Sequence, residues 1–390
     1  MVIFKLALRN LLGAGMRTVL NVAVLSIAFF AIVFMQGLYL GMNEQATDAL
    51  VDTYYGGGQY WHTEYDPYDP FALDDSHAPL PEELEQLVTD GRATPILMVK
   101  ATSFPHGRIL PATLQGIPTE QNIIAIPSHE LEVESDAIPA LIGTRMAKSA
   151  RLEVGDYLTI RWRDANGTYD AADVQIVHIM QTTVQMIDAN KVWVSLNNLQ
   201  DMASMPEQAT IVVTEKGFSD AIQADGWAFQ GHDVLLADIK ALVQQKTIGA
   251  SILYILLLFL GMLAIFDTQV LSIFRRQKEI GTLIALGMTR SKVIRLFTLE
   301  GALHGLLAAI FGFLWGSPLL YLMAKNGWPM PEYGDDFGMA LGEAIYPMYT
   351  GGLILGTTIL VLITVTIVSF LPTRRIAKLK PTDALRGKRA

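Results

Sequence analysis

Four long apolar runs restrict this chain of 390 residues more than any other feature of its sequence. They cover residues 18–40, 248–274, 301–323 and 350–371. A run of about 18 or more apolar residues is long enough to form a helix that crosses the roughly 30 Å hydrocarbon core of a bilayer. The sequence therefore predicts a membrane protein with four transmembrane α-helices.

The segment between the first two runs, residues 41–247, has the pattern of a folded domain. Short strands and helices are interspersed along it, which indicates an α+β domain with a mixed sheet. An amphipathic helix over 226–247 is expected to continue directly into the second apolar run. Strands are predicted at 93–101, 111–116, 157–162, 173–181, 191–195 and 210–214, and helices at 81–88, 142–150, 197–202 and 218–224.

Lysine and arginine are distributed unevenly, and their distribution predicts the orientation. The short pieces 1–17, 275–300 and 372–390 hold 16 of the 29 basic residues. The pieces 41–247 and 324–349 hold the other 13, together with 34 of the 38 acidic residues. Short loops rich in lysine and arginine stay in the cytoplasm. Both termini and the 275–300 loop are therefore predicted to be cytoplasmic, and the α+β domain extracytoplasmic.

The first piece, residues 1–17, alternates apolar residues with Lys5, Arg9 and Arg17. This pattern favours an amphipathic helix that lies at the membrane surface. The alternative is that the piece is only the basic flank of the first transmembrane run, and this would leave the topology unchanged.

The loop between the second and third runs has the pattern of a helix, a turn and a second helix. Residues suited to one helix face recur at Ile280, Leu283, Ile284 and Gly287. Gly287 is expected to end the first helix, because glycine readily adopts a left-handed conformation. Thr289 or Ser291 is expected to cap the second. A cationic, amphipathic element at this place is suited to pressing an apolar side chain into a partner protein.

The same loop resembles a known family. Residues 276–301 read R-Q-K-E-I-G-T-L-I-A-L-G-M-T-R-S-K-V-I-R-L-F-T-L-E-G, similar to the FtsX-like ABC permease signature R-x-x-E-I-G-x-x-x-A-x-G-x-x-x-x-x-I-x-x-x-F-x-x-E. Residues 371–386 resemble the family ending P-x-R-R-A-A-x-x-x-P-x-[ED]-A-L-R, and residues 7–11 its opening A-x-R-N-L. Two independent cytoplasmic matches make the resemblance specific.

The resemblance implies a four-span permease whose 275–300 loop is a coupling helix that docks onto a cytoplasmic ABC ATPase dimer. The basic tail 372–390 is expected to contact the same ATPase. The implied coupling residues are Arg276, Glu279, Ile280, Gly281, Leu283, Ala285, Leu286 and Gly287. The implied tail contacts are Arg374, Arg375, Leu385 and Arg386.

Two acidic residues near this loop allow more than one interpretation. Glu279 matches the glutamate of the family signature, which favours a coupling role over a merely solvated helix charge. Asp267 lies deep in the second run, and an intramembrane carboxylate indicates function by default. For Asp267 we favour hydrogen bonds across a dimer, or to Thr268 and Gln269, over a proton relay.

Small residues recur along the third run at intervals of four or seven. Such spacing lets helices approach closely, so we expect a tightly packed bundle or a dimer seam without a water-filled pore. The packing residues are Gly301, Gly305, Gly312 and Gly316.

No catalytic motif is present in the sequence. It lacks the phosphate loop G-x-x-x-x-G-K-[ST], the zinc motif H-E-x-x-H and the nucleophile motif G-x-S-x-G. It contains no cysteine, and its seven histidines are scattered without metal-ligand spacing. We therefore expect no enzyme activity, no cofactor, no metal and no nucleic-acid partner. ATP is expected to bind to the partner subunit.

Residues 142–160 and 192–199 resemble the extracytoplasmic domains of the lipoprotein-releasing (LolC/LolE) and MacB-type permeases. In the carrier-capturing LolC type, the resemblance implies a long proline-containing hook after the G-D strand. The corresponding link, 163–172, has no proline, and its Asn166-Gly167 pair favours a tight type I′ turn. This departure favours a LolE-like role.

The function we expect is a mechanotransmission permease in the bacterial inner membrane that moves lipoproteins toward the outer membrane. Its expected partners are a second permease subunit, identical or different, a lipoprotein carrier or cargo, and membrane lipid. MacB-like export of peptides or drugs is the first alternative. A regulator of a cell-wall hydrolase, which transports nothing, is the second.

Overall fold

The computed structural model describes residues 2–69, 71–181, 185–219, 221–329 and 344–376. Within these residues the chain forms two compact units. The helical unit comprises residues 2–42, 243–329 and 344–376, and the sheet unit comprises residues 43–242.

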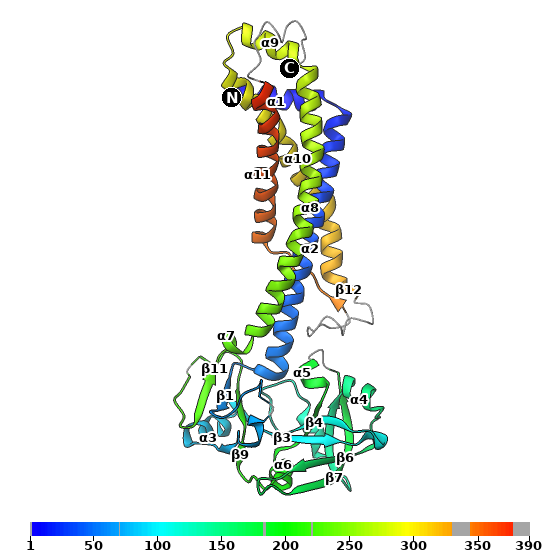
Figure 1. The fold of residues 1–390 in the computed structure, drawn as a ribbon, viewed down its shortest axis with the longest axis vertical. Coiled ribbons are helices and arrows are strands. Elements are labelled where there is room, and N and C mark those ends of the chain that lie inside the picture. Colours follow the sequence, from blue (N-terminus) through cyan, green and yellow to red (C-terminus); the bar gives the residue numbers. More distant parts are fainter. Residues whose placement is uncertain (1, 70, 182–184, 220, 330–343, 377–390) are drawn as a thin grey trace. The chain divides into compact units, whose positions relative to one another are not determined.

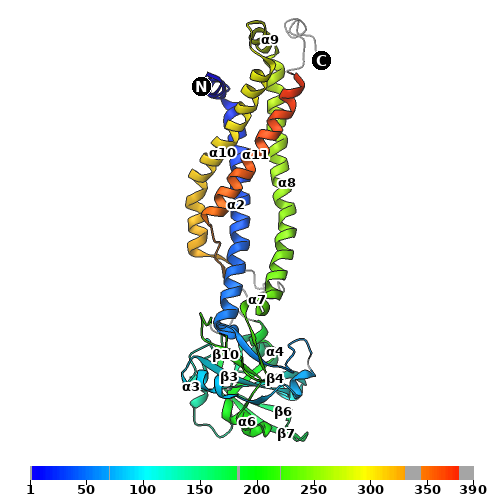
Figure 2. The same cartoon turned by 90° about the vertical axis from the view of Figure 1, so that its left-hand side faces the viewer.

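The helical unit is built from six α-helices. Four of them, α2, α8, α10 and α11, lie side by side (Figures 1 and 2). Each carries a stretch long and apolar enough to cross a membrane: Thr18–Tyr55, which extends past the end of α2, Ala237–Ser272, Arg290–Asn326 and Gly351–Arg374. The helices are α1 Val2–Gly13, α2 Met16–Leu50, α8 Ala237–Arg275, α9 Gln277–Ala285, α10 Arg290–Asn326 and α11 Gly351–Ile376.

Several helices run further than the apolar pattern indicates. Helix α2 continues ten residues beyond position 40 and is followed by a π-helical turn, Val51–Tyr55. Helix α10 begins at Arg290, so the second half of the 275–300 loop and the third apolar run form one helix. Hydropathy detects the part of a helix that lies in hydrocarbon, whereas the backbone hydrogen bonds continue as long as nothing interrupts them.

The predicted helix over 226–247 is right only in its second part, and the one over 218–224 is wrong. From Ala237 the chain is helical and continues into the second apolar run as α8, as predicted, but Trp227–Gln230 is a strand, β11, and α7 is only His232–Leu235. The described residues of 218–224 are not helical either. Strand β11 pairs antiparallel with a strand at 59–62, and Trp227 is buried. Long-range pairing thus overrides the local amphipathic pattern.

The sheet unit contains a nine-stranded mixed sheet in the order β11-β1-β10-β3-β4-β8-β5-β7-β6. The pairs β4–β8 and β5–β7 are parallel, and the remaining pairs are antiparallel. The strands are β1 Gln59–His62, β3 Ala93–Ser103, β4 Leu110–Ile117, β5 Ile138–Gly143, β6 Tyr157–Arg163, β7 Tyr169–Met180, β8 Lys191–Ser195, β10 Ile211–Thr214 and β11 Trp227–Gln230.

Short helices and two small sheets complete the fold. The helices are α3 Glu82–Thr89, α4 Thr144–Ala150, α5 Gln185–Asp188 and α6 Leu196–Ala203. The two-stranded sheets are β2 Ala78–Pro79 with β9 Gln208–Ala209 and, in the helical unit, β12 Trp328–Pro329 with β13 Ala344–Ile345. The predicted fold class, four apolar helices and a large α+β domain with a mixed sheet, is confirmed.

Six of the strands close into a small barrel, because β6 also pairs with β3. Inward and outward side chains alternate along its strands, as the two-residue period of a strand requires. In β6, for example, Leu158, Ile160 and Trp162 are buried while Tyr157 and Arg163 are exposed. The inward residues of the barrel form one apolar core, to which α4 and α6 contribute.

The hairpin between β6 and β7 is tight, but the type I′ prediction for it is wrong. Gly167 N–H donates to the Asp164 carbonyl at 3.0 Å, and Gly167 has a φ of +83°. Asn166 does not have a positive φ, although a type I′ turn needs one at both central residues. The bond therefore closes a turn over 164–167 that ends in a left-handed glycine, a common connection for a slightly longer hairpin loop.

Candidate functional site

The α9–α10 junction is closed by a local hydrogen-bond pattern. Gly287, at φ +97°, follows the last turn of α9 and donates to the Ile284 carbonyl at 3.0 Å. Met288 N–H donates to the Leu283 carbonyl at 3.0 Å. These two bonds make a Schellman motif, which satisfies carbonyls that the helix end leaves free. Gly287 thus ends the helix as predicted, and Thr289 is the N-cap residue of α10.

The apolar face of α9 points toward α10 rather than outward. Ile280 is only 4% exposed, and with Ile284 it packs against Val293 and Phe297 of α10. The face that the sequence offers to a partner is therefore used to hold the helix pair together. Leu286 is the exception, since it is 80% exposed at the end of α9.

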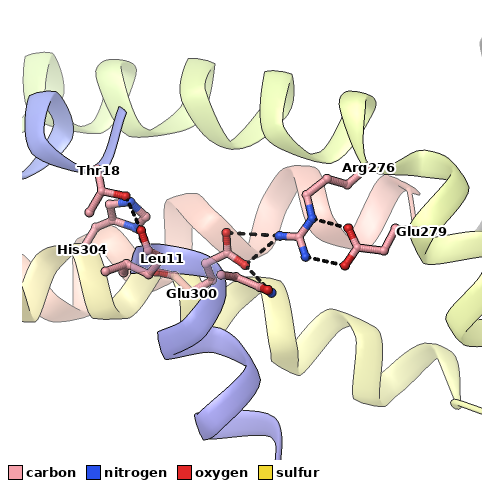
Figure 3. Close-up of polar contacts among 7 residues, drawn as sticks. Leu11, Thr18, Arg276, Glu279, Glu300 and His304 are labelled. Atoms are coloured by element: carbon pink, nitrogen blue, oxygen red, sulfur yellow. Dashed lines mark hydrogen bonds and ion pairs between the residues drawn. The ribbon is translucent and has the colours of Figure 1, made fainter. Parts of the chain in front are cut away.

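Arg276, between α8 and α9, binds two carboxylates at once (Figure 3). Its Nε and Nη2 donate to the two Glu279 carboxylate oxygens at 2.7 and 2.8 Å. Its Nη1 donates to Glu300 Oε2 at 3.1 Å and to Oε1 at 3.4 Å. A paired, fork-shaped arrangement of this kind fixes orientation as well as charge.

Glu300 connects three helices. It lies on α10, is 4% exposed, and accepts hydrogen bonds from Arg276 and from Asn10 Nδ2 of α1, the latter at 3.3 Å. Its backbone carbonyl is 2.9 Å from His304 Nδ1 one turn further along α10. We call Arg276, Glu279, Glu300 and Asn10 the polar clamp. Removing one partner from a buried ion pair is costly, because the other charge stays buried without compensation.

The charges of the polar clamp stabilise one another. The hydrogen bond from Arg276 lowers the pKa of the Glu279 carboxyl below its usual range. The hydrogen bond to Glu279 in turn raises the pKa of the Arg276 guanidinium. The Arg276 guanidinium carbon also lies 4.9 Å from the centre of the Phe297 ring, which adds a cation–π contact. Both charges are therefore fixed at neutral pH.

Glu300 was not among the predicted coupling residues, although it is the final glutamate of the quoted signature. The sequence could have indicated its role. Glu300 directly precedes the third apolar run, and a carboxylate at that position needs a basic partner.

The remaining predicted coupling residues divide by exposure. Gly281 is buried and Leu283 is half-buried, whereas Ala285, Leu286 and Gly287 are exposed. Glu279 has about half of its side chain exposed. The structure thus brings Arg276 and Glu279 together with Glu300, and leaves the tip of α9 accessible.

Of the predicted tail contacts, Arg374 is exposed in the last turn of α11. Arg375 belongs to the same helix, and Leu385 and Arg386 lie outside the described residues.

Asp267 is exposed on α8. Among the described residues it makes no hydrogen bond or ion pair, and the expected bond to Gln269 is not formed. Gln269 is instead buried, at 5% exposure.

The four predicted packing glycines lie at contacts within the chain. A Cβ added at Gly301 would come 1.9 Å from Ser369 Oγ, and one at Gly305 would come 3.3 Å from Val365 Cβ, both on α11. On α2, a Cβ at Gly312 would lie 3.0 Å from Phe29, and one at Gly316 would lie 2.8 Å from Phe30. Glycine is thus required where α10 meets its neighbours most closely.

In the part of the chain that the structure describes, no group of three or more histidine, aspartate or glutamate side chains could hold a metal ion. What the structure shows at this site is a set of helix contacts and an exposed helix tip.

Comparison with known proteins gives consistent results. Residues 251–381 match the family model described as FtsX-like permease C-terminal. The chain is 26% identical over 167 residues to an uncharacterized ABC transporter permease, MJ1507, of Methanocaldococcus jannaschii, covering 40% of this chain and 38% of that protein. It is 22% identical over 189 residues to the macrolide export ATP-binding/permease protein MacB of Psychrobacter cryohalolentis, covering 48% of this chain and 25% of MacB.

The chain thus spans well under half the length of these relatives. Among solved structures, the extracellular domain of the noncanonic ABC-type transporter YknZ from Gram-positive bacteria matches with a TM-score of 0.27 and 14% identity. That match covers 42% of this chain and 84% of the YknZ domain.

The four apolar helices and the matched C-terminal region define the class as a membrane-embedded permease of the ABC-transporter type. Within this class, residues 251–381 match the FtsX-like permease family, and the chain is similar to ABC transporter permeases of that type.

Proposed function

We propose that this protein is the permease subunit of a mechanotransmission ABC system in the bacterial inner membrane. In this proposal a cytoplasmic ATPase dimer docks on the tip of α9, and its motion is passed through the polar clamp to α1 and α10. The observation that carries the proposal is the combination of an exposed Leu286 with a firmly held helix. A helix that transmits force needs one face free for the partner and another face fixed to the bundle.

The exposed tip is suited to docking. Leu286 is 80% exposed, and the neighbouring Ala285 and Gly287 are small and also exposed. A few residues that enter well-packed pockets of the partner carry most of the binding energy of a typical interface. Ile280 packs against α10, and Arg276 binds both Glu279 and Glu300. These contacts hold in place the helix that carries Leu286.

The orientation in this proposal follows from charge. Lysine and arginine are concentrated in 1–17, 275–300 and 372–390, so the termini and α9 are assigned to the cytoplasm. Reporter fusions test this assignment. Fusions at Gly167 and Asn326 are expected to be periplasmic, and fusions at Gly287 and Ala390 cytoplasmic. A cytoplasmic signal at Gly167 would contradict the four-span topology.

A second permease subunit is proposed to cover α8. Only 24% of the most apolar window of this helix is buried within the described structure, and Asp267 is exposed within it. An isolated carboxylate facing hydrocarbon is costly, whereas a hydrogen-bonding residue of a second subunit would satisfy it. A single cysteine at Asp267, in a chain that has none of its own, would crosslink two subunits if both are copies of this chain.

Docking is tested by Leu286→Asp in the full chain. This change introduces a charge at the exposed tip and leaves the inward face of α9 intact. If Leu286 is a hot spot, binding of the ATPase is expected to weaken by about 2 kcal/mol or more, roughly thirtyfold in Kd. The matched control is Val154→Asp, at an exposed apolar residue of the sheet unit. Unchanged ATPase binding and stimulation in Leu286→Asp would show that α9 is only a connector.

The polar clamp is tested separately, by Glu300→Gln. This variant keeps the hydrogen-bonding shape of the side chain and removes the charge that faces Arg276. We expect the ATPase to bind nearly as well as to the wild type, while transport per ATP hydrolysed falls, because the tip is present but its support is loosened. An equal fall in binding and transport would instead assign Glu300 to the docking surface.

For cargo, we propose lipoprotein release toward the outer membrane, with a LolE-like role. The short polar hairpin over 164–168 supports this role, because it offers little apolar surface to hold a carrier protein. The protein is therefore expected to bind a lipoprotein carrier weakly, with carrier docking done by its partner subunit. Tight carrier binding that is lost when 163–172 is replaced by Gly-Ser would overturn this role.

The second candidate is MacB-like export of peptides or drugs, and the similarity to the Psychrobacter MacB favours it. Reconstituted complexes distinguish the candidates. Lipoprotein release without an outer-membrane channel supports the first, and drug or peptide export that needs an adaptor and a channel supports the second. Activation of a cell-wall hydrolase without any transport would identify the protein as a regulator.

A further inference from the structure

A groove between α1, α10 and α11 is not used by the proposed coupling mechanism. It has a cavity volume of about 410 Å³. Its lining is almost wholly apolar, and among the residues that the structure describes Arg295 is the one charged residue in it. The lining residues are Ile3, Ile294, Arg295, Thr298, Leu299, Ala302, Thr366 and Phe370. All of them belong to the helical unit.

The groove has an apolar end and a basic end. On α10, Ala302 lies seven residues from Arg295, which places them about 10 Å apart along the helix at 1.5 Å per residue. On α11, Thr366, Phe370 and Arg374 follow one another at intervals of four residues and so share one face. Since α10 begins at 290 and α11 ends at 376, the arginines lie near these two helix ends.

The two arginines are available for a ligand. Arg295 and Arg374 are both exposed. Among the described residues, neither forms a salt bridge, and the nearby carboxylate of Glu300 is already bound by Arg276 and Asn10. A pair of unneutralised guanidinium groups beside an apolar groove favours an occupant that carries a negative charge next to a hydrocarbon chain.

A buried polar atom within the groove points the same way. Thr298 Oγ1 is buried and has no hydrogen-bond partner among the described residues. A hydroxyl left unbonded in such a place costs free energy, and an oxygen atom of a ligand would accept a hydrogen bond from it. The hydroxyl lies one helical turn from Arg295 on α10, between the charged and the apolar ends.

We propose that this groove is a binding site for one anionic phospholipid. An acyl chain would occupy the part lined by Ala302, Thr366 and Phe370, and the phosphate would face Arg295 and Arg374. The groove opens toward the bilayer, because Phe370 and the adjacent Leu371 are 38% and 53% exposed on a membrane-spanning helix. Basic pockets between transmembrane helices are suited to anionic headgroups, which are concentrated in the cytoplasmic leaflet.

The test uses the full chain in nanodiscs of phosphatidylcholine that contain a minor fraction of phosphatidylglycerol. The photoreactive residue p-benzoylphenylalanine replaces Phe370, whose ring it resembles, and mass spectrometry identifies the crosslinked product. We expect phosphatidylglycerol to be captured well above its share of the lipid. Arg295→Gln and Arg374→Gln are each expected to reduce this preference about fivefold, the effect of one basic residue near an anionic surface.

Filling the groove gives a second, independent readout. Ala302→Leu is expected to lower the capture of both lipids, whereas Leu314→Phe, at an exposed position on the same helix, is expected to change neither. Arg295→Lys is expected to restore most of the preference that Arg295→Gln loses. Size-exclusion profiles in detergent show whether each variant is folded before its lipid capture is compared.

Three results would overturn the proposal. The first is capture of the two lipids in proportion to their abundance, unaffected by Arg295→Gln. The second is a crosslink to a second copy of the chain in place of lipid. The third is a crosslink to the chain's own residues 377–390. None of these results bears on ATPase docking, so the proposed permease function is tested separately by Leu286→Asp.

Discussion

The barrel of the sheet unit and the helices of the helical unit use similar apolar residues in opposite ways. In the barrel, Leu114, Ile142 and Val194 are fully buried in one core, and the strands turn polar side chains outward. In the four apolar helices, between 22% and 33% of the most apolar window is buried within the structure. Leu314 and Ile363, for example, are more than half exposed.

This difference reflects two solvents. Water drives the barrel to bury its apolar surface, and burial of that surface stabilises the unit. Lipid tails are as apolar as leucine, so they give the helices no comparable reason to bury their side chains. The helices associate instead through close packing at glycines and through a few buried polar contacts, such as the polar clamp.

The largest expected effect is the difference between truncating a side chain in the barrel core and truncating one on an exposed helix face. Leu114→Ala removes a fully buried side chain from the barrel core and is expected to destabilise the sheet unit by about 2–5 kcal/mol. Leu314→Ala, at a residue 66% exposed on α10, is expected to cost less than about 0.5 kcal/mol. Denaturant unfolding of both variants in detergent, followed by tryptophan fluorescence, measures the first effect.

The effect of Leu314→Ala is measured by a probe in the helical unit. A single cysteine at Ala308, which is fully buried, would report opening of the bundle through its reaction with a thiol reagent during heating. If Leu314→Ala increased this reaction as much as a buried truncation does, the exposed helix faces could not be in contact with lipid or detergent.

A smaller effect is expected from close packing of helices. Gly301→Leu places a side chain where even a Cβ would lie 1.9 Å from Ser369 Oγ, and overpacking of this kind costs about 1–3 kcal/mol. The control is Gly356→Leu on α11, where a Cβ would meet no atom within 4 Å. The cysteine at Ala308 is expected to react at a lower temperature in Gly301→Leu and at the wild-type temperature in Gly356→Leu. Equal behaviour of the two variants would contradict the α10–α11 contact.

The last effect concerns a charge in the sheet unit, and it is spread over two pH units. Lys191 Nζ lies 3.9 Å from the centre of the Tyr54 ring, and burial lowers the pKa of the Lys191 ammonium from 10.5 to about 7. Between these two values the unfolded chain binds more protons than the folded chain. Stability is therefore expected to rise from pH 7 to pH 9, by at most about 1.4 kcal/mol per pH unit.

Substitution identifies the group responsible for this rise. Lys191→Met is expected to flatten the dependence of the unfolding midpoint on pH, measured through tryptophan fluorescence. Lys148→Met, at an exposed lysine on α4, is expected to leave it unchanged. A wild-type slope that persists in Lys191→Met would assign the pH dependence to another group.

Much of this architecture could be predicted from the order of residues alone. The four apolar runs predicted the membrane helices, because their length matches the thickness of hydrocarbon and needs no tertiary information. Gly287 predicted the end of α9, because a left-handed residue at a helix end is a local requirement that glycine meets best. The sequence likewise predicted a strand at 157–162, and in the structure Leu158, Ile160 and Trp162 form its buried face.

Other features depended on contacts between distant residues. Strand β11 forms over 227–230 because β1 offers its backbone as a partner, although the local pattern favours a helix. The barrel closes because β6 pairs with β3, some sixty residues earlier in the chain. Neither partner can be identified from the residues of one strand, since period and propensity describe a strand without naming its neighbour.

The candidate site shows the same division. The sequence by itself determined that residues 275–300 form a cationic, amphipathic element, because charge and helical spacing are local properties. Only the tertiary structure decided which face is free. Ile280 turns inward because Val293 and Phe297 bury it. Arg276 is fixed because it binds Glu300 of α10, whose carboxylate also accepts a hydrogen bond from Asn10 of α1. Leu286 is left exposed, because the contacts that hold α9 use its other side chains.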